Sequence, residues 1–198
     1  MLRRLLWLPS ILFINAIAAP LDSAAGVPDP AQSTVDVCLR VCPDGDLGFS
    51  VVVRDVNALP LVGSFVNVDP CACPDLVLCP ENACPLTALT DSLGGASFSL
   101  PAGGTCATPI VEVRADGILL AVVPVVSPDQ DGNKIVDAAD DALLTGKLGG
   151  GDLSGDLDCD GAVTAGDLAE LQLHLEHNCL GPVQNMSGSW GRMKAIYR

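Results

Sequence analysis

The sequence predicts a two-domain protein: a mainly β sandwich over residues 33–125, followed over residues 127–178 by a small α-helical domain. Three observations lead to this fold class. Short runs of alternating apolar and polar residues, separated by Gly and Pro, fill the first region with the period of half-buried strands. No helical spacing of apolar residues occurs before Val136. Beyond that residue, leucines recur at helical spacing after each of two acidic segments.

The N-terminal residues 1–18 have the layout of a cleavable secretory signal peptide. Arginines precede an apolar run, and small residues end it at Ala18. A membrane anchor would need about 20 uninterrupted apolar residues, whereas Pro9 interrupts this run. Residues 19–32 are rich in small residues and Pro and are predicted to be a linker. We therefore expect an exported protein without a membrane span, either secreted or held at the cell surface.

The composition limits the kinds of partner. The formal net charge is −14, and 49% of the residues are hydrophobic. An acidic surface of this kind repels nucleic acid and favours cations, while the apolar content excludes an acidic disordered chain. We expect a folded protein that has no nucleic-acid partner.

The strands predicted in the first region are STVDVCLRV, FSVVVRDV, SFVNVD, ASFSL, PIVEVRA and GILLAVVPVV. Asp116 and Gly117 lie between the last two, and this dipeptide between alternating runs indicates a tight hairpin. The phrases RDVNALPLVGSFVNVD and TDSLGGASFSLPAGG resemble those of bacterial Ig-like and carboxypeptidase-regulatory-like sandwich modules. This resemblance covers about residues 33–125 and implies a Greek-key sandwich in an extracellular bacterial protein, without implying an activity.

Nine cysteines are many for a cytosolic protein and ordinary for an exported one. A Cys-rich insertion at residues 70–90 carries some of them in the spacing C-x-C-x5-C-x4-C. Four thiolates could bind zinc, but paired C-x2-C knuckles are absent and the compartment is oxidising, so we expect disulfides. The disulfide candidates are Cys38, Cys42, Cys71, Cys73, Cys79, Cys84, Cys106, Cys159 and Cys179.

Cys159 and Cys179 are the only two cysteines after Cys106, and this even number favours a bridge between them. The helix predicted between them would span about 18 Å, against a limit of about 7 Å between the Cα atoms of a disulfide. Either the helix ends early and the chain returns, or Cys179 pairs with a cysteine of the β region. The odd number of cysteines in the β region leaves one that is free, bridges two chains or pairs with the C-terminal region.

Two acidic segments share one pattern: DQDGNKIVDAAD at residues 129–140 (loop 1) and DLDCDGAVTAGD at residues 156–167 (loop 2). Both place acids or an amide at positions 1, 3 and 5, an oxygen-bearing side chain at position 9 and Asp at position 12. Ca2+ takes about six to eight oxygen ligands, and this spacing gathers them, with the carbonyl of position 7, in one tight loop. The predicted ligands are Asp129, Asp131, Asn133, Ile135, Asp137 and Asp140 in loop 1, and Asp156, Asp158, Asp160, Ala162, Thr164 and Asp167 in loop 2.

Position 6 of a calcium loop turns sharply and favours Gly, which loop 2 supplies as Gly161 and loop 1 replaces with Lys134. Shifting loop 1 so that Gly132 takes position 6 would put Ala138 at position 12 and remove the closing carboxylate. The unshifted register keeps every ligand. A left-handed Lys costs about 1–2 kcal/mol, a loss of about five- to thirtyfold in affinity. We expect two Ca2+ sites, of which loop 2 is the stronger.

The duplicated pattern DxDxNxxVDxxDxxxL and DxDxDGxVTxxDxxxL resembles the dockerin type I module over about residues 127–178. The resemblance implies two EF-hand-type calcium loops and a non-catalytic domain for protein–protein interaction, often with cohesin domains in assemblies that act in polysaccharide catabolism. The family commonly has Ser-Thr at loop positions 10 and 11. Here those positions hold Ala138-Ala139 and Ala165-Gly166, so the partner is left as a cohesin-like or another extracellular protein.

The remaining reactive side chains do not indicate an enzyme. His174 and His177 stand three residues apart without a third zinc-type ligand at fitting spacing, and we expect a solvated helix end there. Almost all clustered acids already serve as predicted calcium ligands, leaving no nucleophile with a base and no paired carboxylates for hydrolysis.

The predicted function is that of an extracellular scaffold or attachment component. The alternative is an accessory carbohydrate-binding protein, but sugar-binding faces usually present exposed aromatics and the predicted sandwich offers only Phe49, Phe65 and Phe98. Residues 179–198 form a tail with Trp190 and Tyr197, which is either a docking tag or a frayed terminus.

Overall fold

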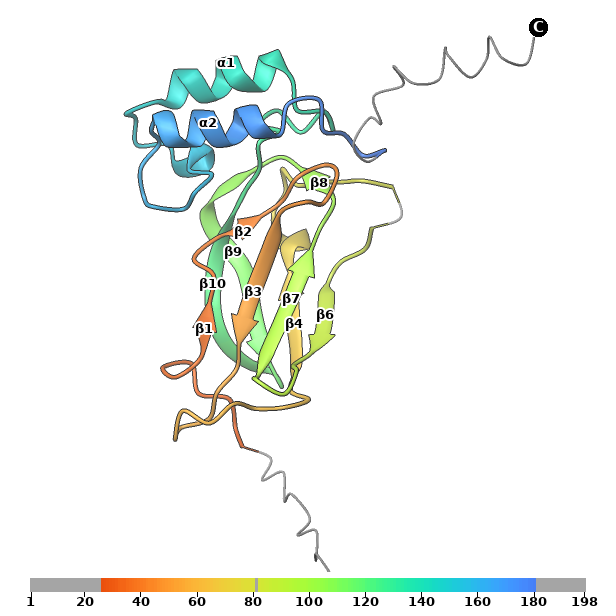
Figure 1. Ribbon diagram of the computed structural model, residues 1–198, viewed down its shortest axis with the longest axis vertical. Coiled ribbons are helices and arrows are strands. Elements are labelled where there is room, and N and C mark those ends of the chain that lie inside the picture. Colours follow the sequence, from red (N-terminus) through yellow and green to blue (C-terminus); the bar gives the residue numbers. More distant parts are fainter. Residues whose placement is uncertain (1–25, 81, 181–198) are drawn as a thin grey trace, which may run out of the picture.

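The computed structural model describes residues 26–80 and 82–180 (Figure 1). The predicted signal peptide, residues 19–25 of the predicted linker and residues 181–198 of the predicted tail lie outside the described residues. The described chain starts close to the β structure, because the backbone N–H of Asp29 donates to the Arg54 carbonyl at 2.8 Å. Within the described residues, neither helix has the length and apolar character that crossing a membrane requires.

The strands fall in three sheets. The largest has the order β2-β10-β9-β4-β6, a second has the order β1-β3-β7, and β5 pairs with β8. Every pairing is antiparallel except that of β2 with β10. The bounds are β1 Thr34–Val35, β2 Leu39–Arg40, β3 Gly48–Val52, β4 Phe65–Asp69, β5 Val77–Leu78, β6 Leu86–Leu89, β7 Gly95–Ser99, β8 Ala102–Gly103, β9 Cys106–Ala115 and β10 Ile118–Val126.

The long hairpin of β9 and β10 shapes the main sheet. Asp116 and Gly117 join the two strands with φ of 47° and 84°, as a two-residue hairpin turn requires, and the predicted hairpin is confirmed. The register between the strands shifts twice, at Leu119/Ala121 and at Val123/Val125. Because bulges bend a strand and increase its twist, the five-stranded sheet curls into a half-barrel.

The core lies inside this curl and follows the two-residue period of the strands. Val66 and Val68 of β4 and Val111 and Val113 of β9 are fully buried, and they alternate with more exposed neighbours. Phe49 of β3 lies opposite Phe98 of β7, with ring centroids 6.4 Å apart. The alternation read from the sequence therefore reports which face of each strand is buried.

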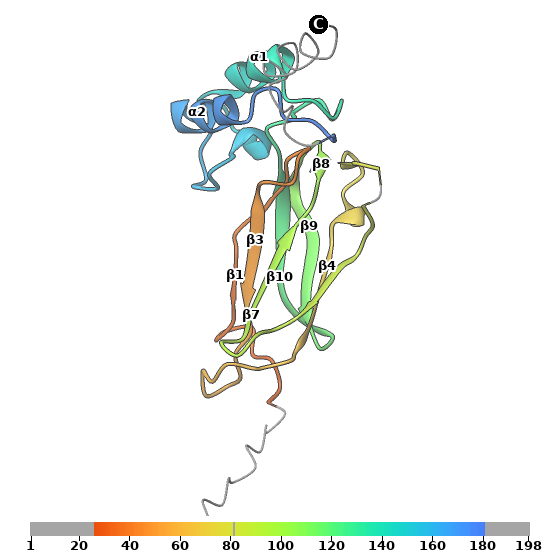
Figure 2. The same cartoon turned by 45° about the vertical axis from the view of Figure 1, so that its right-hand side comes forward.

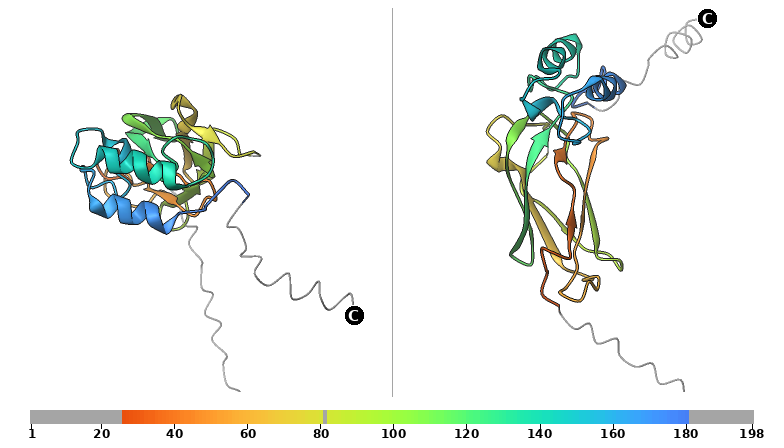
Figure 3. Two further views of the ribbon diagram at one scale, coloured as in Figure 1. Left: turned by 90° about the horizontal axis from the view of Figure 1, so that it is seen from above. Right: turned by 90° about the vertical axis from the view of Figure 1, so that its left-hand side faces the viewer.

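Two short α-helices, α1 (Ala138–Lys147) and α2 (Ala165–Leu173), lie side by side across one end of the β structure (Figures 2 and 3). Two 3-10 turns, η1 (Pro70–Ala72) and η2 (Leu153–Gly155), complete the elements. Leu144 of α1 and Leu171 of α2 are fully buried. They share one apolar cluster with Val126 of β10 and with Cys38 and Cys42, which flank β2.

The predicted fold class, a β-sandwich followed by a two-EF-hand helical domain, is wrong. Over residues 26–80 and 82–180 the protein is mostly β, with a curled half-barrel sheet and only two short helices. Helices of 10 and 9 residues are too short to be stable alone. Their buried leucines pack against each other and also against the end of the β structure. Alternation and helical spacing are local signals, and they did not reveal this shared core.

Four disulfides hold the described chain: Cys38–Cys159, Cys71–Cys84, Cys73–Cys106 and Cys79–Cys179. The preference for disulfides over a four-thiolate zinc site is confirmed. Cys179 does not pair with Cys159; it pairs with Cys79 of the β region, which was the second alternative. Cys159 also pairs with the β region, through Cys38. Cys42 is the free, buried cysteine. Four disulfides are typical of a protein exposed to an oxidising compartment.

Candidate metal-binding loops

Loop 1 begins where β10 ends and closes on the first turn of α1. Asp129 is fully buried, and its carboxylate accepts the backbone N–H groups of Asn133 at 3.1 Å and Lys134 at 2.9 Å. Asp140, also fully buried, accepts the N–H groups of Gln130 at 2.7 Å and Asp137 at 2.8 Å. The loop is therefore folded around its first and last carboxylates.

Loop 2 repeats this network residue for residue. Asp156 accepts the N–H groups of Asp160 at 3.1 Å and Gly161 at 2.9 Å. Asp167 accepts those of Leu157 and Thr164, each at 2.7 Å. Each bond has its counterpart in loop 1 at the same loop position, with a length that differs by no more than a tenth of an ångström.

The two backbones also turn at the same positions. Position 6 is left-handed in both loops, with φ of 76° at Lys134 and 93° at Gly161. Position 4 is left-handed as well, with φ of 71° at Gly132 and 62° at Cys159. A lysine in this region of φ is uncommon, and it is found at the loop position where the repeat requires it.

The structure brings together only some of the predicted ligands. Carboxylate oxygens of Asp129, Asp131 and Asp140 lie within 4.8 Å of one another, and so do those of Asp156, Asp158 and Asp167. The position-9 residues instead cap the helices: Asp137 accepts the Ala139 N–H at 2.7 Å, and Thr164 accepts the Gly166 N–H at 3.0 Å.

The position-5 side chains, Asn133 and Asp160, fold back on their own loops. They accept the N–H groups of Ile135 and Ala162 respectively, each at 2.9 Å. In both loops the side chain thus turns toward position 7, the residue whose carbonyl is the predicted ligand.

Burial and mutual repulsion make these carboxylates unfavourable as free anions. Burial above all, with the charges of Asp140 and Asp131, raises the pKa of Asp129 to about 7. Burial also raises the pKa values of Asp140 and Asp158. A divalent cation between three acids would favour their charged forms. The donor atoms are all oxygens, which fits a hard cation such as Ca2+.

A half-buried lysine connects the two loops. Lys147 Nζ, at the end of α1, donates to Gln130 Oε1 of loop 1 at 2.6 Å and to Ser154 Oγ at 2.7 Å. Ser154 lies in η2, which leads into loop 2. Burial lowers the pKa of Lys147 below its usual value. The two loops are therefore parts of one hydrogen-bonded unit.

An apolar groove of about 710 Å3 opens beside loop 1. Ile135 and Leu175 line it, and they are 47% and 40% exposed. Exposed apolar side chains gathered around a groove mark a candidate contact surface for another molecule.

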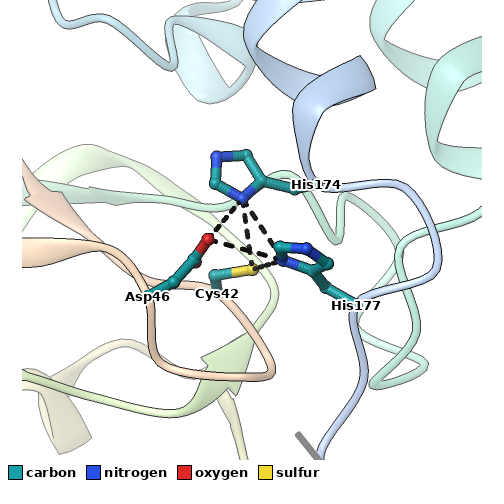
Figure 4. Close-up of side chains that lie close together, drawn as sticks. All are labelled: Cys42, Asp46, His174 and His177. Carbon is teal, nitrogen blue, oxygen red and sulfur yellow. Dashed lines mark hydrogen bonds and ion pairs between the residues drawn. The ribbon is translucent and has the colours of Figure 1, made fainter. Parts of the chain in front are cut away.

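The prediction that His174 and His177 lie at a solvated helix end is wrong. α2 ends at Leu173, and His174 lies 7% exposed against the segment that follows β2. There the rings of His174 and His177 face Cys42 and Asp46 (Figure 4). Sequence reasoning missed the cluster because it counted Cys42 with the disulfide candidates. The available signal was an odd cysteine in CPDGD and a separate H-x-x-H pair.

No protein-family model matches this chain, and no curated protein is similar to it at the level taken to show a relative. The function is therefore argued from the chemistry of the loops themselves.

Proposed function

We propose that this chain is an exported, non-catalytic calcium-binding protein that serves as an extracellular attachment or scaffold component. The observation that carries the proposal is the equivalence of loops 1 and 2. Two segments of different sequence share acids at matching positions, the same backbone turns and the same hydrogen bonds. If loop 1 were only an acidic turn formed by chance, a second loop with the same arrangement would not be expected.

Each loop offers oxygen ligands of the type that Ca2+ prefers. In loop 1, Asp129, Asp131 and Asp140 would supply clustered carboxylates, with Asn133 and the Ile135 carbonyl beside them. In loop 2, Asp156, Asp158 and Asp167 would do the same, with Asp160 and the Ala162 carbonyl. Bound calcium would offset two of the three negative charges in each cluster and fix the first turn of the following helix.

Isothermal titration calorimetry of the disulfide-bonded chain tests this proposal. We expect two calcium-binding events, with Asp140→Asn removing the loop 1 event and Asp167→Asn the loop 2 event. Asp141→Asn is the matched control, because it makes the same charge change on α1 outside the acidic cluster. Absence of calcium binding at millimolar concentration, or an equal loss of calcium binding in all three variants, would contradict the proposal.

The groove at Ile135 and Leu175 supports binding of a protein partner. Its exposed apolar lining lies next to a loop that calcium would order, so capture of a partner should require calcium. We expect Leu175→Asp to remove a captured partner that wild-type protein retains. Leu93→Asp, at a 72% exposed leucine before β7, is the control and should retain it. Equal capture by both variants would place the interaction elsewhere.

The aromatic residues weigh against the carbohydrate-binding alternative. Phe49 and Phe98 are 1% and 9% exposed and belong to the core. Of the phenylalanines of the β region, Phe65 is the one on the surface, at 48% exposure. A single exposed ring gives little surface for stacking on sugars.

A further inference from the structure

Four potential ligands of a softer metal meet where the helical end joins the β structure (Figure 4). Cys42 and Asp46 come from the segment between β2 and β3, and His174 and His177 follow α2. Cys42 is fully buried, and His174 is 7% exposed. The Asp46 side chain is 38% exposed and that of His177 is 21% exposed, which leaves an entry path.

The distances among these ligand atoms are those of a small tetrahedron. Cys42 Sγ lies 4.0 Å from His174 Nδ1 and 3.7 Å from His177 Nδ1, and the two nitrogens are 3.4 Å apart. Asp46 Oδ2 lies 2.9 Å from His174 Nδ1 and 3.5 Å from His177 Nδ1. Tetrahedral zinc with Zn–S of about 2.3 Å and Zn–N of about 2.0–2.1 Å separates its ligand atoms by about 3.3–3.6 Å.

Ion pairs of His174 Nδ1 with Asp46 Oδ2 at 2.9 Å and of His177 Nδ1 with Asp44 Oδ2 at 2.8 Å account for each ring singly. They do not require the two Nδ1 atoms and the Cys42 sulfur to lie within 4.0 Å of one another, as they do here. At His177 the ring geometry does not fit a Cys-His-Asp catalytic group. Such a group uses opposite nitrogens of one histidine, whereas Cys42 Sγ and Asp44 Oδ2 both lie on Nδ1 of His177, at 3.7 and 2.8 Å.

We propose that Cys42, Asp46, His174 and His177 bind one Zn2+ ion. The set of one sulfur, two imidazole nitrogens and one carboxylate suits zinc, whereas the oxygen-only loops suit calcium. The thiolate and carboxylate charges together balance the charge of the ion. The site stands on observations separate from those of the calcium loops.

The surroundings of the four residues support the assignment. The outer nitrogen of His174, Nε2, faces Glu170 Oε1 of α2 at 3.7 Å, and a carboxylate behind a ligating histidine is a common orienting partner. Glu170 is itself held by an ion pair with Arg40 of β2. Asp44 Oδ2 lies 2.8 Å from His177 Nδ1, the nitrogen that would face the ion, so this carboxylate would turn away from the nitrogen or join the ligands when zinc binds. Zinc binding would also explain why Cys42 remains outside the four disulfides.

In the fold, the ion would join the end of α2 to the β2–β3 segment. The Cys79–Cys179 disulfide attaches the chain to the β structure just beyond the histidines. The zinc site and this disulfide would together fix the C-terminal end of the helical pair.

Metal analysis and cobalt spectroscopy of the disulfide-bonded chain test the proposal. We expect one equivalent of zinc per chain. Co2+ in its place should give a thiolate-to-cobalt charge-transfer band and the intense visible bands of tetrahedral coordination. Cys42→Ser should remove the charge-transfer band. His177→Gln, at a partly exposed position, should weaken zinc binding by at least about tenfold, while Asp141→Asn leaves it unchanged.

Calcium titration of the same variants checks that they are folded and separates failure of the zinc site from failure of the calcium loops. The proposal would be overturned by wild-type protein that takes up no Co2+ in tetrahedral form, or by a charge-transfer band that survives Cys42→Ser.

Discussion

Single residues determine how loops 1 and 2 differ. Lys134 and Gly161 occupy the same loop position, and both have left-handed φ values, 76° and 93°. Glycine adopts this conformation readily, whereas a residue with a side chain is strained by about 1–2 kcal/mol. At position 6 the strain lies in loop 1 alone, and from it we expect loop 1 to bind more weakly although the ligands are alike. At position 4 the left-handed residue with a side chain is in loop 2, at Cys159, which the disulfide to Cys38 fixes in the fold.

Replacing Lys134 with Gly should tighten calcium binding at loop 1 by about five- to thirtyfold, because it removes this strain. Calorimetry with loop 2 inactivated by Asp167→Asn measures the loop 1 affinity directly. Gly161→Lys is the reciprocal variant and should weaken loop 2 by a similar factor. Unchanged affinity in both variants would show that backbone strain does not set the difference.

At the scale of elements, a two-residue strand supports loop 1. β8 passes so close to Asp129 that a Cβ atom on Gly103 would lie 1.7 Å from Asp129 Oδ2. The Gly104 N–H donates to the Asp129 carbonyl at 2.9 Å. The strand therefore holds the first ligand of the loop by backbone contact alone.

Gly103→Ala should displace the Asp129 carboxylate and weaken calcium binding at loop 1 by at least about tenfold, while loop 2 keeps its affinity. Gly151→Ala is the matched control, because a Cβ atom there meets nothing within 4 Å. Calorimetry on the two variants gives the comparison. An equal effect at both loops would contradict a local role for β8.

Local elements were the part of the structure that the sequence predicted best. The Asp116-Gly117 hairpin was predictable because its turn chemistry and its alternating flanks are contiguous. Loop 1 and loop 2 were found as a repeat for the same reason. The cluster of Cys42 with His174 and His177 was not predictable, because its members come from opposite ends of the chain and meet only when α2 packs on the β structure.

At the scale of the whole molecule, two disulfides join the helical end to the β region. Cys38–Cys159 closes a sequence separation of 121 residues, and Cys79–Cys179 closes one of 100. Their partners could not be assigned from spacing, because the two cysteines of each pair lie far apart in the sequence. Long-range cross-links and a shared apolar cluster make the helices part of one body.

Removing Cys38–Cys159 by a double serine substitution should lower the free energy of unfolding by about 4–5 kcal/mol, since closure of a long loop restricts the unfolded chain most. Removing Cys71–Cys84, with a separation of 13 residues, should cost less, about 3 kcal/mol. Denaturant unfolding in saturating calcium measures both losses. A larger loss for the shorter bridge would contradict the entropic account.

The central claim is that both loops bind calcium and that loop 2 binds it more tightly. The backbone N–H groups of Lys134 and Gly161 each donate to the first acid of their loop at 2.9 Å, so they report directly on that carboxylate. A calcium titration followed by amide nuclear magnetic resonance measures both sites at once. We predict that both signals shift and that Gly161 saturates at the lower calcium concentration. Two signals that stay unmoved at millimolar calcium, or a Lys134 signal that saturates first, would contradict the account.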